Sequence, residues 1–289
     1  MFTDWRDWSV YKKLLPLYVF FWRRGRRLRL FLSRTIAIWL IPRSEKSPRE
    51  SVTAILSRFT PFRSVLELQR VGSPHDGGYL IPKDLSGVSA LYSPGVGDNV
   101  EFDIQIASKG IPVFLADNSV DFEITNQPLV KFIKKHLGLH ESDSQITLDA
   151  WIEAEQAPVE VKSLMLQMDI EGAEWEILRC QRAETLNKFK VIVVEIHELQ
   201  KVFSKSGLEQ VSSWLDTVTA NHRIVNAHIN NGEIDVSYRG VSVPPIVELV
   251  LLRDESDYNW EPETEIPHQL EAANDPDFKM NSKRFWGQK

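Results

Sequence analysis

The sequence has little of three features that would define other classes of protein: cysteine, long apolar runs and internal repeats. Cys180 is the only cysteine in 289 residues, so no disulfide can form within the chain, which fits a reducing compartment such as the cytoplasm. The longest uncharged apolar run, residues 14–22, has nine residues, whereas a membrane-spanning helix needs about 20. Four arginines lie where a signal peptide would have small residues. We therefore expect neither a spanning helix nor a cleaved signal.

The net charge of −6 divides unequally along the chain. Residues 1–43 carry ten Lys or Arg and two acids, a net +8, whereas residues 44–289 carry 24 basic and 38 acidic residues, a net −14. Basic clusters beside aromatic and aliphatic side chains are typical of a helix that lies on an anionic membrane, here its inner face. The alternative, which the sequence leaves open, is that this leader packs on the body. Because the body is acidic and has no groove-reading motif, we expect no nucleic-acid partner.

The composition, 43% hydrophobic and 26% charged, is that of a folded globular chain and excludes disordered and collagen-like classes. We divide the chain into a basic aromatic leader at 1–43, a capped helix and linker at 44–63, a main domain at 64–253, and an acidic extension at 254–289 that packs on the domain or trails from it. In the second part, Ser47, Pro48 and Glu50 form the pattern of a capping box, which predicts a helix that ends before Pro61.

From residue 88, short apolar runs rich in β-formers alternate with helical patterns. The predicted strands are 88–92, 113–116, 163–168, 191–196, 223–228 and 246–252, with 145–148 as a seventh. This alternation predicts an α/β, Rossmann-like fold with a mostly parallel sheet and helices on both faces. The last crossover, 230–245, has no helical pattern, which allows the final strand to enter antiparallel. Before the alternating region, 65–71 and 79–81 flank a glycine-rich turn and predict a hairpin.

The loop after the first strand, Ser93-Pro-Gly-Val-Gly-Asp-Asn99, indicates a nucleoside-bearing cofactor. Gly95 and Gly97 allow the backbone to approach a ligand closely. Asp117 ends the next strand about twenty residues later, the spacing of an acid that accepts hydrogen bonds from a ribose. A dinucleotide site would need a third glycine, and an acid at Asp98 favours a cation. S-adenosylmethionine, whose sulfonium is positively charged, therefore fits better than NAD.

Two later strand ends carry further polar segments. One is Asp169-Ile-Glu-Gly-Ala-Glu174, which is the most specific segment of the chain, and the other is Glu195-Ile-His197. These segments resemble the FkbM-type, S-adenosylmethionine-dependent methyltransferases. Further segments that resemble this family are Asp76-Gly-Gly-Tyr79, Ser93-Pro-Gly-Val-Gly-Asp98, Thr147-Leu-Asp149, Asn230-Asn231 and Pro244-Pro-Ile-Val-Glu-Leu249, so the resemblance spans about residues 64–277. Ser93 and Asn99 depart from the general methyltransferase loop, which has an acid and a glycine there. The leader lies outside the resemblance.

The resemblance implies a class I methyltransferase fold, with seven strands of which the last is antiparallel, and O-methylation of a hydroxyl on a sugar, glycan or small metabolite. It places Gly95, Gly97 and Asp98 at the methionine end of the cofactor and Asp117, with Asn118, at the ribose. Asp149 would lie near the adenine, and Asp169 and Glu171 where the methyl group meets the acceptor.

A hydroxyl acceptor must lose its proton, and Glu171, Glu195 and His197 are the candidate bases. Asp169, Glu195 and His197 would also suit Mg²⁺ or Mn²⁺, but nothing in their spacing requires convergence, so we predict no metal. The residues predicted to contact the acceptor are His75, Asp76, Tyr79, His228, Asn230 and Asn231. Two other functions stay open: an NAD-dependent sugar oxidoreductase, and an inactive membrane-associated adaptor.

Overall fold

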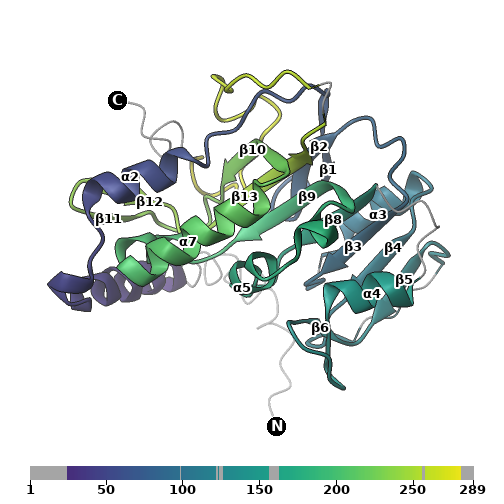
Figure 1. The fold of residues 1–289 in the computed structure, drawn as a ribbon, viewed down its shortest axis with the longest axis horizontal. Coiled ribbons are helices and arrows are strands. Elements are labelled where there is room, and N and C mark those ends of the chain that lie inside the picture. The colour runs from purple at the N-terminus through teal and green to yellow at the C-terminus, as the bar shows by residue number, and fades with distance from the viewer. Residues whose placement is uncertain are drawn as a thin grey trace, which may run out of the picture.

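The computed structural model describes residues 25–97, 99–121, 123, 126–155, 163–255 and 258–280. Its centre is a seven-stranded mixed sheet with helices packed against it (Figure 1), which confirms the α/β class. In spatial order the strands are β10 (His222–Ile229), β13 (Val247–Arg253), β9 (Phe189–Ile196), β8 (Leu164–Met168), β3 (Ala90–Pro94), β4 (Val113–Ala116) and β5 (Val130–Ile133). Strand β13 runs antiparallel to both of its neighbours, and the remaining pairs are parallel.

The seventh strand of the sheet was predicted in the wrong place. Residues 145–148 contribute only β7 (Gln145–Ile146), which pairs with β6 (His136–Leu137) in a separate small sheet. Thr147 then caps α4 (Leu148–Ala154) by accepting a hydrogen bond from the backbone of Ala150. The main sheet instead gains β5, an edge strand with a single fully buried residue, so its sequence lacks the apolar run of a central strand.

Alternate residues along each strand supply two separate cores. Tyr92 and Leu166 face the core beneath α2 (Arg49–Ser57), α4, α5 (Glu174–Arg179), α6 (Ala183–Leu186) and α7 (Lys205–Val218). Leu91 and Met165 face the opposite core, which is covered by α3 (Glu101–Ser108) and by the predicted hairpin, β1 (Leu68–Gly72) with β2 (Gly78–Pro82). Helices were expected on both faces, but in the described part of the chain a hairpin takes much of the second face. This hairpin lies over β9 and β13.

Several short elements complete the fold, and the last crossover contains one of them, a small hairpin. They are the 3₁₀ turns η1 (Arg43–Glu45) and η2 (Leu199–Phe203), and the hairpin β11 (Val236–Tyr238) with β12 (Val241–Val243). The predicted capping box at Ser47 does not form. Pro48 takes the N-cap position of α2, and the backbone N–H of Ser47, which a capping box would pair with Glu50, donates a hydrogen bond to the carbonyl of Phe203 at 3.0 Å.

Part of the leader packs on the body. Residues 25–40 form a helix, purple in Figure 1, whose Ile38 is buried in the first core. The apolar run at 14–22 lies outside the described residues. None of the described helices is both long and apolar enough to span a membrane. The described part of the C-terminal extension also packs on the domain, since Asn274 is buried and hydrogen-bonded.

Candidate active site

The glycine loop after β3 is shaped by the neighbouring strand end. Gly95 has φ +84°, and a Cβ added there would lie 1.7 Å from the carbonyl oxygen of Asp169, so only glycine lets these two strand ends meet. Gly97 has φ +53° but open space around it. Asp98 lies outside the described residues. The loop therefore presents bare backbone to the space beyond the carboxyl ends of β3 and β4.

Asp117, at the end of β4, is held in place as an ionised carboxylate. Its Oδ1 accepts hydrogen bonds from the N–H of Ser119 at 2.7 Å and the hydroxyl of Ser119 at 2.6 Å, and its Oδ2 accepts one from the N–H of Gly97 at 3.3 Å. Burial acts to raise the pKa of Asp117, but these hydrogen bonds, with nearby His136, outweigh it and hold the pKa below its usual value. A cavity of about 560 Å³ is lined by Gly95, Gly97, Asp117 and His136.

Two residues predicted to bind the cofactor do not reach this cavity. Asn118 places its backbone N–H 3.5 Å from a ring nitrogen of His136 and does not line the cavity. Asp149 is the first-turn acid of α4, and its carboxylate accepts hydrogen bonds from Arg182 and Thr185, each at 2.8 Å. These partners lower its pKa against the effect of burial. The hydrogen bonds of Asp149 thus link α4 to the start of α6. His136, which the sequence did not single out, lines the cavity instead.

Asp169 lines three neighbouring cavities at the strand ends. It borders the glycine-loop cavity of about 560 Å³, a second of about 250 Å³ beside Tyr79 and Gln167, and a third of about 440 Å³ that includes Glu195 and His197. The loop after β8 therefore separates the space predicted for the cofactor from the space predicted for the acceptor. Asp169 and Glu171 line both of these spaces.

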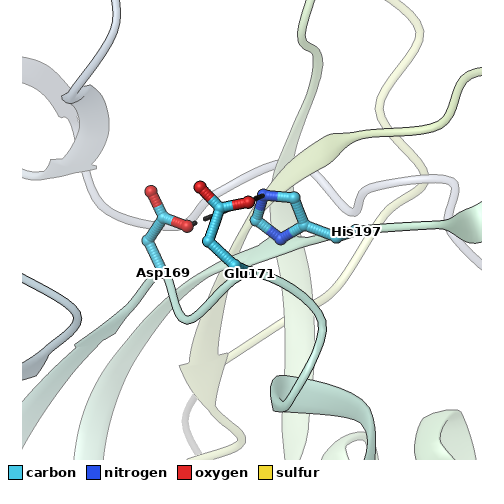
Figure 2. A group of neighbouring side chains, drawn as sticks. All are labelled: Asp169, Glu171 and His197. Atoms are coloured by element: carbon cyan, nitrogen blue, oxygen red, sulfur yellow. Dashed lines mark ion pairs between the residues drawn. The ribbon is translucent and has the colours of Figure 1, made fainter. Parts of the chain in front are cut away.

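Figure 2 shows how Asp169 and Glu171 converge on the ring of His197. The Nε2 atom of His197 lies 3.7 Å from Asp169 Oδ1, 3.6 Å from Glu171 Oε2 and 3.9 Å from Glu195 Oε1. Glu171 reaches this position with φ +55°, a strained conformation for a non-glycine residue. The carboxyl ends of parallel strands meet at one edge of a sheet, so β8 and β9 bring these four predicted residues together.

Glu174, which the sequence did not single out as a site residue, orients the histidine. Its side chain is fully buried, and Oε1 accepts a hydrogen bond from the backbone N–H of His197 at 2.6 Å and lies 3.2 Å from ring Nδ1. Its Oε2 accepts a hydrogen bond from the N–H of Gly172 at 2.8 Å. The carboxylate therefore assigns the Nδ1–H tautomer to neutral His197 and leaves the Nε2 lone pair facing the cavity.

Burial and mutual repulsion shift the pKa values of the clustered groups. Burial raises the pKa of Asp169 to about 7, with His197 acting against it and Glu171 and Asp76 adding to it. Burial also raises the pKa of Glu195 well above its usual value, helped by the charge of Asp169. For His197, burial lowers the pKa, but Glu174, Asp169 and Glu171 outweigh it, so the pKa is raised. Such shifted acids and bases are typical of catalytic sites.

Of the six residues predicted to contact the acceptor, Asp76 and Asn230 line the third cavity. Tyr79 lines the second and receives a hydrogen bond from Gln167 at 3.3 Å. Nδ1 of His75 lies 3.2 Å from the backbone carbonyl oxygen of Ala273, and His75 lines none of the three cavities.

His228 and Asn231 hold the C-terminal segment rather than line the cavity. His228 bonds to Asn274 at 2.8 Å, and Asn231 donates to the carbonyls of Asp275 and Phe278, each at 2.8 Å. That segment contributes Asn274, Asp275 and Phe278 to the cavity wall. Arg26 and Arg27, from the leader helix, complete the wall. Because these residues lie far from the strands in sequence, no motif linked them to the site.

Two groups of side chains have the donor atoms to hold a divalent cation. One atom from each of Asp169, Glu171 and His197 falls within 4.8 Å of the others, and the same holds for Asp76, Glu195 and Glu248. The first group has Glu171, whose side chain is mostly exposed, in place of Glu195 of the trio that the sequence did not favour as a metal site. Oxygen with one nitrogen would suit Mg²⁺ or Mn²⁺.

A mostly parallel sheet with a glycine loop, a strand-end acid and a buried acid–histidine cluster at its carboxyl edge defines an α/β protein, and that edge is where such sheets ordinarily bind ligands. Residues 105–224, 120 of the 289, match the family model described as the methyltransferase FkbM domain. The resemblance is thereby confirmed for the segment that contains Asp117, Asp169, Glu174 and His197. A search of the curated proteins gave no match.

Proposed function

We propose that the protein is an S-adenosylmethionine-dependent methyltransferase that methylates a hydroxyl of a sugar, glycan or small metabolite. The observation that carries the proposal is the position of Asp169 between the glycine-loop cavity and the cavity of His197. The strand order, with β13 antiparallel between β9 and β10, supports a class I methyltransferase fold. The match to the FkbM domain favours this function over the oxidoreductase and adaptor alternatives.

In this proposal, the position of each residue decides whether it binds the cofactor or the acceptor. The cofactor supplies a methyl group on a positively charged sulfur. The bare backbone at Gly95 and Gly97 lets it approach, and Asp117, ionised, accepts hydrogen bonds from its ribose hydroxyls. The carboxylates around His197 favour a cation beside Asp169. Holding acceptor and methyl donor in line across Asp169 lowers the entropy cost of the reaction.

His197 is the base in this mechanism. Nε2 of His197 would accept the proton that the acceptor hydroxyl loses when its oxygen takes the methyl group that the bound cofactor would supply. Glu174 fixes the tautomer and stabilises the imidazolium that forms, since its Oε1 lies 3.2 Å from Nδ1. The cavity side chains Asp76 and Asn230 are placed to hydrogen-bond the other hydroxyls of a polyhydroxylated acceptor.

Calorimetry with S-adenosylhomocysteine tests the cofactor site. We expect the wild type to bind it and not NAD, and Asp117→Ala to weaken binding by about tenfold or more, as for loss of charge-assisted hydrogen bonds of about 1.5–3 kcal/mol. Asp121→Ala is the matched control, because this acid lies four residues further on and its carboxylate is largely exposed. No binding by the wild type, or equal binding by both variants, contradicts the proposal.

A further inference from the structure

The leader helix at residues 25–40 is bound to the body by one face. Arg27 donates hydrogen bonds to the carbonyls of Asn231 at 2.9 Å and Glu233 at 3.0 Å. Arg34 forms an ion pair with the carboxylate of Glu233 at 2.9 Å, and both side chains are largely buried. Ile38, one turn further, is only 5% exposed. This spacing places one continuous face of the helix against the domain.

The opposite face is apolar and exposed. Leu28, Leu32, Ile36 and Leu40 recur every four residues, and Trp39 lies in the same sector, although its ring also packs edge to face against Tyr238 of the body, at 5.7 Å between centroids. They are 51, 47, 56, 76 and 67% exposed in that order, Trp39 last. The other large exposed apolar side chains of the described part of the chain, Val65, Leu129 and Leu270, lie elsewhere in the sequence. We name these five side chains the apolar stripe; along the helix it is about 18 Å long.

Charge sets the kind of surface that the stripe fits. Residues 8–44 contain no acid, although the rest of the chain is strongly acidic. Arg26 and Arg29 are exposed on the helix that carries the stripe, and Arg43 is exposed just beyond its end. An apolar stripe with a tryptophan and flanking arginines is typical of a helix that lies in the interface of an anionic membrane.

The same helix borders the candidate acceptor cavity. Arg26 and Arg27 line that cavity, and Arg26 is one turn or less from Leu28 and Arg29. Carboxylates and amides line the interior, so the deep part suits hydroxyl groups, whereas a guanidinium at the wall suits a phosphate. A molecule anchored in a membrane beneath the stripe would have its headgroup beside this cavity.

We propose that the apolar stripe docks the protein on an anionic lipid surface and that the methyl acceptor is a lipid-anchored compound with a phosphate and a hydroxylated headgroup. The second part rests on the proposed function, and the first does not. Docking places the cavity wall at the membrane surface, Arg26 binds the phosphate, and the hydroxyls reach Asp76, Asn230 and His197.

Vesicle flotation of the full chain tests the docking. We expect the wild type to float with vesicles of phosphatidylcholine and phosphatidylglycerol and to float poorly with phosphatidylcholine alone. The double variant Leu32→Ser/Ile36→Ser should lose about tenfold or more of the bound fraction, because apolar contact with the interface is lost. The matched control, Leu129→Ser/Leu270→Ser, removes two exposed leucines elsewhere and should float like the wild type. Circular dichroism and S-adenosylhomocysteine binding verify that each variant is folded.

Three results overturn the docking. The first is equal flotation of wild type and Leu32→Ser/Ile36→Ser. The second is a wild type that does not float but sediments as a dimer that the double variant disrupts, since a second copy would then cover the stripe. If deletion of residues 1–24 is needed before the protein floats, those residues cover the stripe in solution, which also overturns docking by the intact chain.

Labelling tests the acceptor. The protein is incubated with radiolabelled S-adenosylmethionine and either a total lipid extract in vesicles or the water-soluble metabolites of the cells that produce it. We expect label in the lipid fraction, about tenfold less with Leu32→Ser/Ile36→Ser. Label only in the water-soluble fraction overturns the lipid-anchored acceptor alone. No cofactor binding and no label in either fraction, with flotation intact, overturns the proposed function and leaves the docking.

Discussion

The sharpest test of the catalytic cluster is the substitution Glu174→Gln, which removes one buried charge and keeps the side chain's shape. Glu174 is fully buried, and its Oε1 lies 3.2 Å from Nδ1 of His197. Among the groups that raise the pKa of His197, Glu174 is the largest, ahead of Asp169 and Glu171. Without that charge, the effect of burial, which lowers the pKa, should dominate.

The expected direction follows from the distance. An opposite charge this close favours the protonated form of an imidazole, so we expect Glu174→Gln to lower the pKa of His197 from its raised value, with Asp169 and Glu171 still acting to raise it. Because the pKa is raised in the folded wild type, protonated His197 stabilises the fold at low pH. That stabilisation is lost as the pH rises through the raised value. The variant should lose this contribution.

Titration by ¹H–¹⁵N nuclear magnetic resonance of the imidazole nitrogens measures the pKa directly and needs no acceptor. His197→Gln identifies the signal. Glu176→Gln is the control, since it removes the same charge from the same helix at an exposed position. The Nδ1 signal of the wild type should also show the Nδ1–H tautomer. A pKa of His197 that is the same in Glu174→Gln and in the wild type would refute the assignment of Glu174 as its partner.

Three further outcomes are expected. Asp103→Asn should raise the unfolding free energy at about pH 8 by up to about 4 kcal/mol and by little near pH 4, because burial raises the pKa of Asp103 to about 7; a gain that does not vary with pH in urea unfolding would contradict this. Gly95→Ala should abolish S-adenosylhomocysteine binding in calorimetry, because its Cβ would meet the Asp169 carbonyl, whereas Gly97→Ala should cost only backbone strain. Burial lowers the pKa of His222 to about 4, so the stability of the wild type should fall by about 3 kcal/mol as the pH drops from about 6.5 to about 4. His222→Gln should flatten that slope in thermal melts.

The central strands could be predicted because burial on both sides leaves a clear pattern. Residues 164–168 and 191–196 are almost entirely apolar, and both are central strands. The edge strand β5 is half solvated, so its four residues carry no such pattern and the prediction fell on 145–148. The prediction of a capping box at Ser47 was wrong for a different reason. Its residues suit the motif, but a tertiary hydrogen bond from Ser47 to Phe203 took precedence.

The strand-end part of the site could be predicted for a topological reason. Parallel strands end at the same edge, and the structure makes β8 and β9 neighbours, so the acids and the histidine that follow them meet, although nothing in their spacing required it. Asp149 had the right residue type but sits on α4, where Arg182 and Thr185 engage it. Glu174 belongs to the most specific segment, but its contact with His197 could not be predicted, because an acid in the first turn of a helix is ordinarily explained by the helix dipole.

By itself, the sequence determined the α/β class and pointed to the carboxyl edge, with its acids and histidine, as the candidate site, since each follows from local burial patterns and from the geometry of parallel strands. Only the tertiary structure decided which side chains complete the site. Arg26 of the leader and Asn274 of the C-terminal segment reach the cavity through packing between residues about 250 positions apart. It also separated the two faces of the leader helix, because periodicity shows that a face is apolar, whereas contact with the domain decides which face is covered.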